Sequence, residues 1–419
     1  MRFLAPFFLT LALAAPAGAE PPSAEAGELS MSESENPLSM SEAPPRLSIA
    51  PKGIPPEADA ALLRGIDCVF RMEFDEADAS YRKALALMGG HPYPYLGLVG
   101  SMMTRYIYGT EQSDQALLDK FYKLADEAGA AAQAWLKKNP QDSEAMAALG
   151  ASYGIAARVM TQRRSWLKAY FYGRKALKYT QASLKADPDQ NEAWLGLGMY
   201  DYYTDTYPRF IGVLAKIVLR GDRRRGIAEL YKSVERARYT GTAAKLILVE
   251  IFTEDQFGLR EPKAAARFMK EVRAKYPDSA MLHAAELVAL YEEGHYPEAL
   301  ASADAYLRRV KAGDWPPLHA AQGHLMRGTV LWAKGRQDEA LAEFKLGADV
   351  RYKDGPTRWA VFARIRAGQL LDLMGQREAA LAEYRLAADA PDLWDLKPLA
   401  QAGLKKPRGE TFPGRISPF

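Results

Sequence analysis

Two segments near the end of the chain are copies of one another, forty residues apart. Residues 334–349 read KGRQDEALAEFKLGAD, and residues 374–389 align with them without a gap as MGQREAALAEYRLAAD. The match extends upstream, where Gly328 in the first copy corresponds to Gly368 in the second. A unit of this size cannot bury its apolar face alone, so neighbouring copies must stack on one another.

The spacing within one copy predicts two helices joined by a tight turn. Gly335 marks the turn, and Ala340 and Phe344 lie one helical turn apart on the helix that follows it. Small residues at Gly328 and Ala340 allow two antiparallel helices to approach closely, while Phe344 fills the space towards the next pair. We therefore expect each copy to form a helical hairpin.

This pattern resembles the tetratricopeptide repeat, a family of helical hairpins. Weaker copies occur upstream, at Gly65, Ala77, Tyr81 and Ala84, and at residues 146–153, 194–200 and 296–306. Residues 196–210, GLGMYDYYTDTYPRF, also resemble a stretch of the tetratricopeptide repeat 39 type proteins. The resemblance implies an all-α solenoid of antiparallel helical hairpins, in which the first helix of each pair lines a concave groove.

The copies are irregularly spaced in the middle of the chain. Extra length at residues 100–140, 154–175 and 203–225 predicts long or additional helices there. We expect degenerate N-terminal repeats over residues 57–240, C-terminal repeats over residues 241–403, and an irregular tail over residues 404–419.

The N-terminus has the features of a secretory signal peptide. Arg2 gives a positive start, residues 3–15 form an uncharged apolar run, and residues 17–19, Ala-Gly-Ala, suit signal peptidase. The run is shorter than the roughly 20 residues of a transmembrane helix, so we expect cleavage after Ala19 rather than a retained anchor. Residues 20–56 are rich in Pro, Ser and Glu and lack aromatic side chains, which predicts a disordered acidic linker. The sequence thus predicts an exported chain, periplasmic or secreted, that is soluble after cleavage and has no transmembrane segment.

Composition and motif content exclude several classes of function. The net charge of +3 argues against a strongly basic nucleic-acid binder. One cysteine, Cys68, and five scattered histidines leave no disulfide framework and no zinc-binding spacing. The sequence contains no glycine-rich phosphate loop and no recognisable catalytic constellation, so we expect no cofactor, no metal and no enzymatic activity.

The strongest candidate for a binding surface is a basic, aromatic-rich segment. No acidic residue occurs between Ala145 and Ala186, whereas eight Lys and Arg residues do. Cations beside tyrosine faces suit an anionic or carbohydrate-bearing ligand, or an acidic peptide. The candidate binding residues are Arg158, Arg163, Arg164, Tyr170, Tyr172, Arg174, Tyr202 and Tyr203, the last two placed in the groove by the resemblance. The alternative is that the aromatic residues belong to the core and the cations to a solvated face.

These features predict a non-catalytic scaffold or adaptor that binds a protein or peptide partner in the periplasm or cell envelope. The alternative is a module that binds an anionic polymer, cell-wall glycan or a membrane surface through the basic segment. The repeat family's carboxylate clamp is not predicted, because its asparagine positions carry Ala151, Met199, Thr329 and Gln369 here. Residues 209–225 carry a short amphipathic stripe with basic residues, which we expect to pack inside the solenoid rather than to lie on a membrane.

Overall fold

The computed structural model of the 419-residue chain describes residues 53–163, 165–205, 221–253, 261–353, 355–391, 396–408 and 412–414. The predicted signal peptide, most of the predicted linker and most of the amphipathic segment at 209–225 lie outside these stretches. Ile54, near the end of the predicted linker, is described and is buried in the apolar cluster of the first hairpin.

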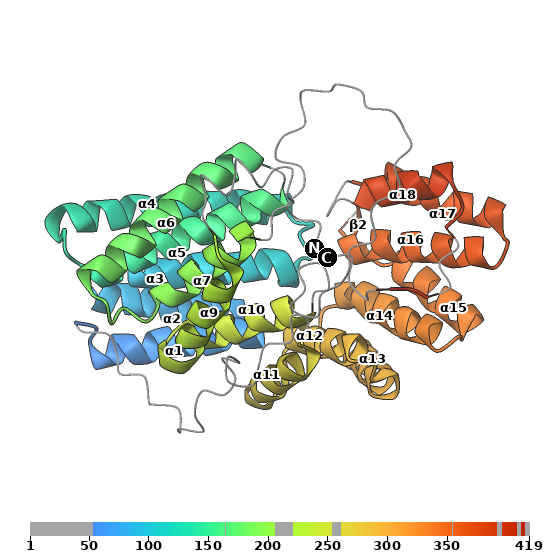
Figure 1. Ribbon diagram of the computed structural model, residues 1–419, viewed down its shortest axis with the longest axis horizontal. Coiled ribbons are helices and arrows are strands. Elements are labelled where there is room, and N and C mark those ends of the chain that lie inside the picture. The colour runs from blue at the N-terminus through green and yellow to red at the C-terminus, as the bar shows by residue number, and fades with distance from the viewer. Residues whose placement is uncertain are drawn as a thin grey trace.

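The helices of the first half follow one another as antiparallel pairs (Figure 1). These pairs are α1 (Pro56–Arg71) with α2 (Phe74–Leu87), α3 (Tyr93–Thr104) with α4 (Gln115–Lys138), α5 (Ser143–Gln162) with α6 (Trp166–Ala186), and α7 (Ala193–Asp205) with α9 (Arg223–Arg236). The extra length predicted at residues 100–140 and 154–175 is confirmed as long helices, since α4, α5 and α6 have 24, 20 and 21 residues. In addition, α3 continues into a π-helical turn, Arg105–Gly109.

The second half continues the same arrangement. Its pairs are α10 (Gly241–Thr253) with α11 (Pro262–Lys275), α12 (Ala280–Glu292) with α13 (Tyr296–Ala312), α14 (Ala320–Ala333) with α15 (Gln337–Ala348), and α16 (Arg358–Leu373) with α17 (Arg377–Asp389). A short 3-10 helix, η3 (Pro317–His319), precedes α14, and α18 (Leu396–Lys405) packs on α17. The boundary predicted near residue 240 lies in the link between α9 and α10, and one apolar cluster spans both helices.

A small β-hairpin is the one departure from helical structure within the described residues. Strands β1 (Arg351–Tyr352) and β2 (Gly355–Pro356) pair antiparallel between α15 and α16. Strands of two residues are too short to carry an alternating pattern, so the sequence gives no sign of them. With this exception, the predicted all-α solenoid of helical hairpins is confirmed.

Contacts between glycine and aromatic rings hold the two helices of a hairpin close together. A Cβ atom at Gly328 would lie 2.7 Å from the ring of Phe344, and Ala340 is fully buried at the same crossing. Gly335 has a positive φ of 74°, a conformation that favours glycine, and it forms the predicted turn between α14 and α15. The residue spacing found in the sequence therefore reflects how the two helices of a hairpin pack.

The second copy packs in the same way and is closed by the last helix. A Cβ atom at Gly368 would lie 2.6 Å from the ring of Tyr384, and one at Gly403 of α18 would lie 2.5 Å from the same ring. Ala380 is fully buried beside them. Helix α18 thus takes the place that the first helix of a further hairpin would have.

Figure 1 shows the helices gathered in two lobes, with α1 to α10 on the left, α13 to α18 on the right, and α11 and α12 joining them. Distant parts of the chain meet between the lobes. Asp114, which caps α4, accepts hydrogen bonds from the Tyr352 hydroxyl at 3.2 Å and from Nζ of Lys353 at 2.9 Å. Tyr276, after α11, donates to Asp67 of α1 at 2.6 Å. The solenoid therefore bends back far enough for early and late hairpins to touch.

Three residues of the predicted tail lie against the C-terminal hairpins. Arg366 of α16 donates to the carbonyl oxygen of Pro413, and Tyr291 of α12 donates to that of Gly414, both at 2.5 Å. The ring of Phe412 lies 6.4 Å from that of Tyr296. The described end of the chain is thus fixed to α12, α13 and α16.

Within the described ranges, no helix is both long enough and apolar enough to cross a lipid bilayer.

Candidate functional site

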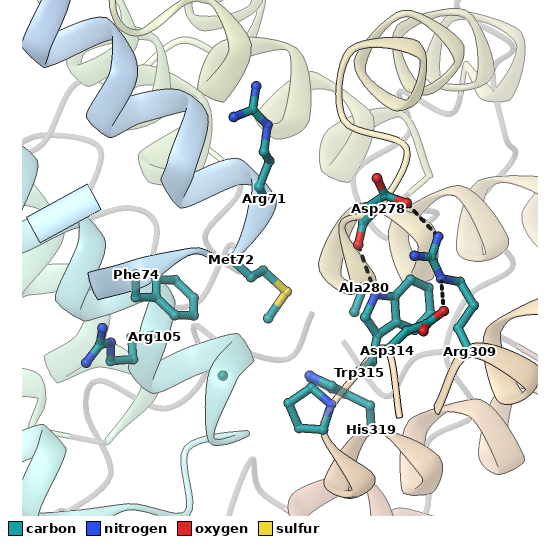
Figure 2. Close-up of a pocket in the computed structure, with 12 residues that line it drawn as sticks. Arg71, Met72, Phe74, Arg105, Asp278, Ala280, Arg309, Asp314, Trp315 and His319 are labelled. Atoms are coloured by element: carbon teal, nitrogen blue, oxygen red, sulfur yellow. Dashed lines mark hydrogen bonds and ion pairs between the residues drawn. The ribbon is translucent and has the colours of Figure 1, made fainter. Parts of the chain in front are cut away.

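A pocket of about 380 Å³ lies between two parts of the chain that are far apart in sequence (Figure 2). One wall comes from the end of α1, the start of α2 and the π-helical turn, and the other from the start of α12, the end of α13 and the link that follows it. The principal lining side chains are Arg71, Met72, Phe74, Arg105, Asp278, Arg309, Asp314, Trp315 and His319. Three guanidinium groups and two large aromatic rings thus surround one cavity.

The first wall is shaped by the abrupt end of α1. Met72 adopts a left-handed conformation with φ of 67°, and its N–H donates to the carbonyl oxygen of Val69, while the N–H of Glu73 donates to that of Cys68. The chain then turns directly into α2, so that Met72 and Phe74 face the pocket (Figure 2). The Arg105 guanidinium lies 5.3 Å from the centre of the Phe74 ring and pairs with Asp75. This wall is therefore an apolar surface edged by a cation.

The second wall is built around Trp315. Its Nε1 donates to the carbonyl oxygen of Asp278 at 2.9 Å, and its ring packs 4.9 Å from that of Tyr306. Arg309 lies 4.9 Å from the Trp315 ring centre and pairs with Asp278 at 2.7 Å and with Asp314 at 3.1 Å. These contacts fix the indole and the guanidinium in one orientation, as Figure 2 shows.

A buried cluster of ionisable side chains lies beside the pocket at His319. The Nδ1 atom of His319, which is 3% exposed, is 3.7 Å from Oε1 of Glu111, which is 1% exposed. Neither side chain has a hydrogen-bond partner in the described part of the chain. Burial lowers the pKa of the neighbouring Arg358 to about 9, although the charge of Glu111 opposes this shift. Contact between the lobes thus removes three ionisable groups from water, which is costly and typical of functional sites.

The backbone next to this cluster is strained. Glu111 and Gln112 have positive φ values of 47° and 61°, directly after the π-helical turn. Non-glycine residues rarely adopt this conformation, and π-helical turns are frequent at functional sites. Strain, buried charge and a cavity therefore coincide where the two lobes meet.

The pocket suits a ligand that carries an apolar group beside a carboxylate. Phe74, Met72 and Trp315 offer apolar contact, and the guanidinium groups of Arg105 and Arg309 offer paired N–H donors. Their present acidic partners are exposed to solvent, since the side chains of Asp75, Asp278 and Asp314 are 89%, 72% and 47% exposed. Exposed ion pairs contribute little stability, so a ligand carboxylate can replace them at small cost.

Two of the predicted binding residues come together away from this pocket. Nη2 of Arg158, on α5, lies 3.1 Å from Oε2 of Glu250 on α10, and the Tyr203 hydroxyl of α7 donates to Oε1 of the same carboxylate at 2.8 Å. The charge of Glu250 raises the pKa of Arg158. This network joins three helices, and it satisfies the arginine within the protein.

The predicted binding residues on α6 lie apart from both the pocket and the Glu250 network. Tyr172 packs against Tyr153 at 5.5 Å and donates to Asp126 of α4 at 3.2 Å, and so belongs to the helix packing. Tyr170 contacts the ring of Phe171, and Arg174 is exposed. The predicted residues therefore do not form one site.

The remaining predicted residues have separate outcomes. Tyr202 does not face the groove, and that placement is wrong: its side chain is fully buried in a cluster with Leu230 and Leu248, because it lies on the side of α7 that packs against α9. Burial raises the pKa of Tyr106, and the positive charge of Arg163, at the end of α5, opposes this shift. Arg164 lies outside the described residues.

The sequence patterns do not identify the residues that line the pocket. Spacing patterns report neighbours within one or two hairpins, whereas this pocket joins residues 71–109 to residues 278–319. Among the lining residues, His319 is one of the five scattered histidines, whose spacing indicates no metal site. One usable signal was present, namely Trp315 in the otherwise polar or turn-forming link KAGDWPP.

Among the side chains that the structure describes, no three His, Cys, Asp or Glu groups are placed to hold a metal ion.

The type of solenoid follows from contacts that recur along the chain. A glycine on the first helix of a hairpin meets an aromatic ring on the second at Gly65 and Tyr81, as it does in the two C-terminal copies. The chain folds as a tetratricopeptide-type solenoid. No family model matches the sequence, and no curated protein matches it either.

Solved structures with a similar fold are distant in sequence. A chain in the crystal structure of the APC/C hetero-tetramer Cut9–Hcn1 is 15% identical, with a TM-score of 0.49, over 82% of this chain. The alignment spans 55% of the length of that chain. A tetratricopeptide repeat protein from Parabacteroides merdae is 14% identical, with a TM-score of 0.31, over 71% of this chain and 94% of that one. Yeast Tom70 is 11% identical, with a TM-score of 0.29, over 81% and 86%.

Proposed function

We propose that this chain is an exported, non-catalytic scaffold that captures a protein partner by a segment seated in the pocket between the lobes. The observation that carries this proposal is the pairing of aromatic and guanidinium groups on both walls, Phe74 with Arg105 and Trp315 with Arg309. Two walls of the same chemistry, from distant hairpins, suit one ligand held from both sides.

The pocket volume indicates what such a segment can place there. A cavity of about 380 Å³ is small beside a folded domain and matches a few side chains. We infer that the partner inserts a large apolar side chain towards Phe74 and Trp315 and directs an adjacent carboxylate to the arginines. The surrounding surface of the solenoid then contacts the rest of the partner.

The export and the scaffold role rest on different supports. Export rests on the signal-peptide features of residues 1–19. The scaffold role rests on the solenoid itself, whose extended surface is of the kind that binds proteins. In the pocket, Arg105 and Arg309 each contact an aromatic ring and a carboxylate, and such contacts are typical of ligand binding.

A peptide-display experiment tests the proposed ligand chemistry. Random peptides selected on the purified chain are expected to be enriched in an aromatic or aliphatic residue next to Asp or Glu. The double variant Phe74→Ala, Arg71→Glu removes apolar surface and reverses one charge at the pocket. We expect it to weaken binding of the selected peptides by at least about tenfold, because both types of contact are lost.

The matched control is Arg82→Glu, which reverses an exposed arginine on α2 outside the pocket lining. It should bind the peptides like the unmodified chain. Selection of peptides without acidic residues, or equal loss of binding in the control, would refute the proposed ligand chemistry.

A further inference from the structure

The outward face of α6 exposes apolar and cationic side chains together. Leu167 and Phe171 are 66% and 55% exposed, and being four residues apart they lie on the same side of the helix. Lys168, Arg174 and Lys178 are exposed around them. The opposite side of the helix packs against α5, with Ala169, Thr180 and Ser183 buried, so these five exposed side chains form one face, which we call the α6 face.

In the part of the chain that the structure describes, the cations of the α6 face have no acidic partners. No ion pair within the described residues involves Lys168, Arg174 or Lys178, and α6 itself contains no Asp or Glu. Asp126 of the neighbouring α4 accepts from Tyr172 on the flank of α6 instead. The face therefore presents unbalanced positive charge to the solvent.

We propose that the α6 face docks on an anionic lipid surface. Leu167 and Phe171 would enter the boundary between headgroups and acyl chains, and Lys168, Arg174 and Lys178 would meet lipid phosphates. A membrane surface offers apolar depth and negative charge along one plane, which matches a 21-residue helix that exposes apolar and cationic side chains together. An acidic protein surface would satisfy the cations but would leave two large apolar side chains to be matched separately.

This inference is independent of the pocket. No residue of α6 lines the cavity between the lobes, so lipid docking and partner capture use separate surfaces. A scaffold that holds a partner while it rests on a membrane surface needs this separation.

Vesicle co-sedimentation tests the proposal. The chain is used from Glu20, the predicted mature start, because the apolar run at residues 3–15 would itself bind lipid. It should sediment with vesicles of phosphatidylglycerol and phosphatidylcholine in equal parts, remain in solution with pure phosphatidylcholine, and be released by high salt. The double variant Leu167→Ser, Phe171→Ser should lower the partition coefficient by at least about tenfold.

The control is the pair Leu346→Ser, Leu386→Ser, which removes other exposed apolar side chains, 53% and 52%, from α15 and α17. It should leave sedimentation unchanged, and circular dichroism should show all variants folded. Absence of binding to anionic vesicles, or full binding by the Leu167→Ser, Phe171→Ser variant, would overturn the proposal.

Discussion

Single small side chains determine how closely the hairpins of this chain can pack. A Cβ atom at Gly65, Gly328 or Gly368 would come within 3 Å of an aromatic ring that is itself buried. Interiors at this density tolerate little added volume. These positions were predictable from the sequence because the repeat spacing depends on them, and the structure confirms the predicted contacts.

Enlarging the alanines at the crossings should destabilise the chain. Ala340→Leu and Ala380→Leu each add volume at a fully buried site, and should lower the free energy of unfolding by about 1–3 kcal/mol. Urea denaturation followed by circular dichroism measures the change. Ala342→Leu, on the exposed side of α15, serves as the control and should have little effect. Neutral results at both buried alanines would contradict the packing described here.

A buried carboxyl group should make stability depend on pH. Burial raises the pKa of Glu144 from 4.5 to about 8, and nearby Glu192 adds to the effect. Because the folded state holds this proton more tightly, the contribution to stability is present at low pH and is lost as the pH rises from about 5 to about 8. Glu144→Gln cannot ionise, and so should be more stable than the original chain at pH 8 but not at pH 5. Equal differences at both pH values would show that Glu144 does not titrate in this way.

At the scale of whole elements, buried carboxylates join helices that are distant in sequence. Asp59 of α1 accepts hydrogen bonds from Nε and Nη2 of Arg238, at 2.7 and 2.6 Å, and from the Tyr239 hydroxyl at 2.7 Å. Glu192, at the start of α7, accepts from the backbone N–H groups of Arg238 and Thr240. The link between α9 and α10 is therefore held by the first hairpin and by α7. No repeat pattern encodes such contacts, which is why the sequence reveals the hairpins but not how they are tied together.

Breaking the Asp59 contact should therefore cost more than removing an ordinary surface charge. Asp59→Ala removes two hydrogen bonds from the partly buried Arg238 guanidinium, and should lower the free energy of unfolding by about 3 kcal/mol. Glu57→Ala removes an exposed acid from the same turn of α1, and should change stability by less than about 0.5 kcal/mol. Thermal denaturation of both variants provides the comparison. Similar melting temperatures for the two would indicate that Arg238 finds another partner.

At the scale of the whole molecule, the bend of the solenoid creates the candidate site. The sequence predicted a groove lined by first helices and a binding surface in the basic segment, because both follow from local pattern. The pocket instead depends on the approach of the first two hairpins to α12, α13 and η3, which is the sum of small rotations between successive hairpins. Such a sum cannot be obtained from spacing alone. The buried pair of Glu111 and His319 likewise exists only because the lobes meet.

Hydrogen–deuterium exchange with a peptide selected by display tests the central claim directly, because it reports both walls of the pocket at once. If the ligand is held between the lobes, its addition should slow exchange at residues 105–112 and, in the same experiment, at residues 309–319. Residues 166–186 of α6, which line no part of the pocket, should exchange as before. Protection of one wall only, or protection confined to α5, α6 and α7, would contradict a site formed by the meeting of the two lobes.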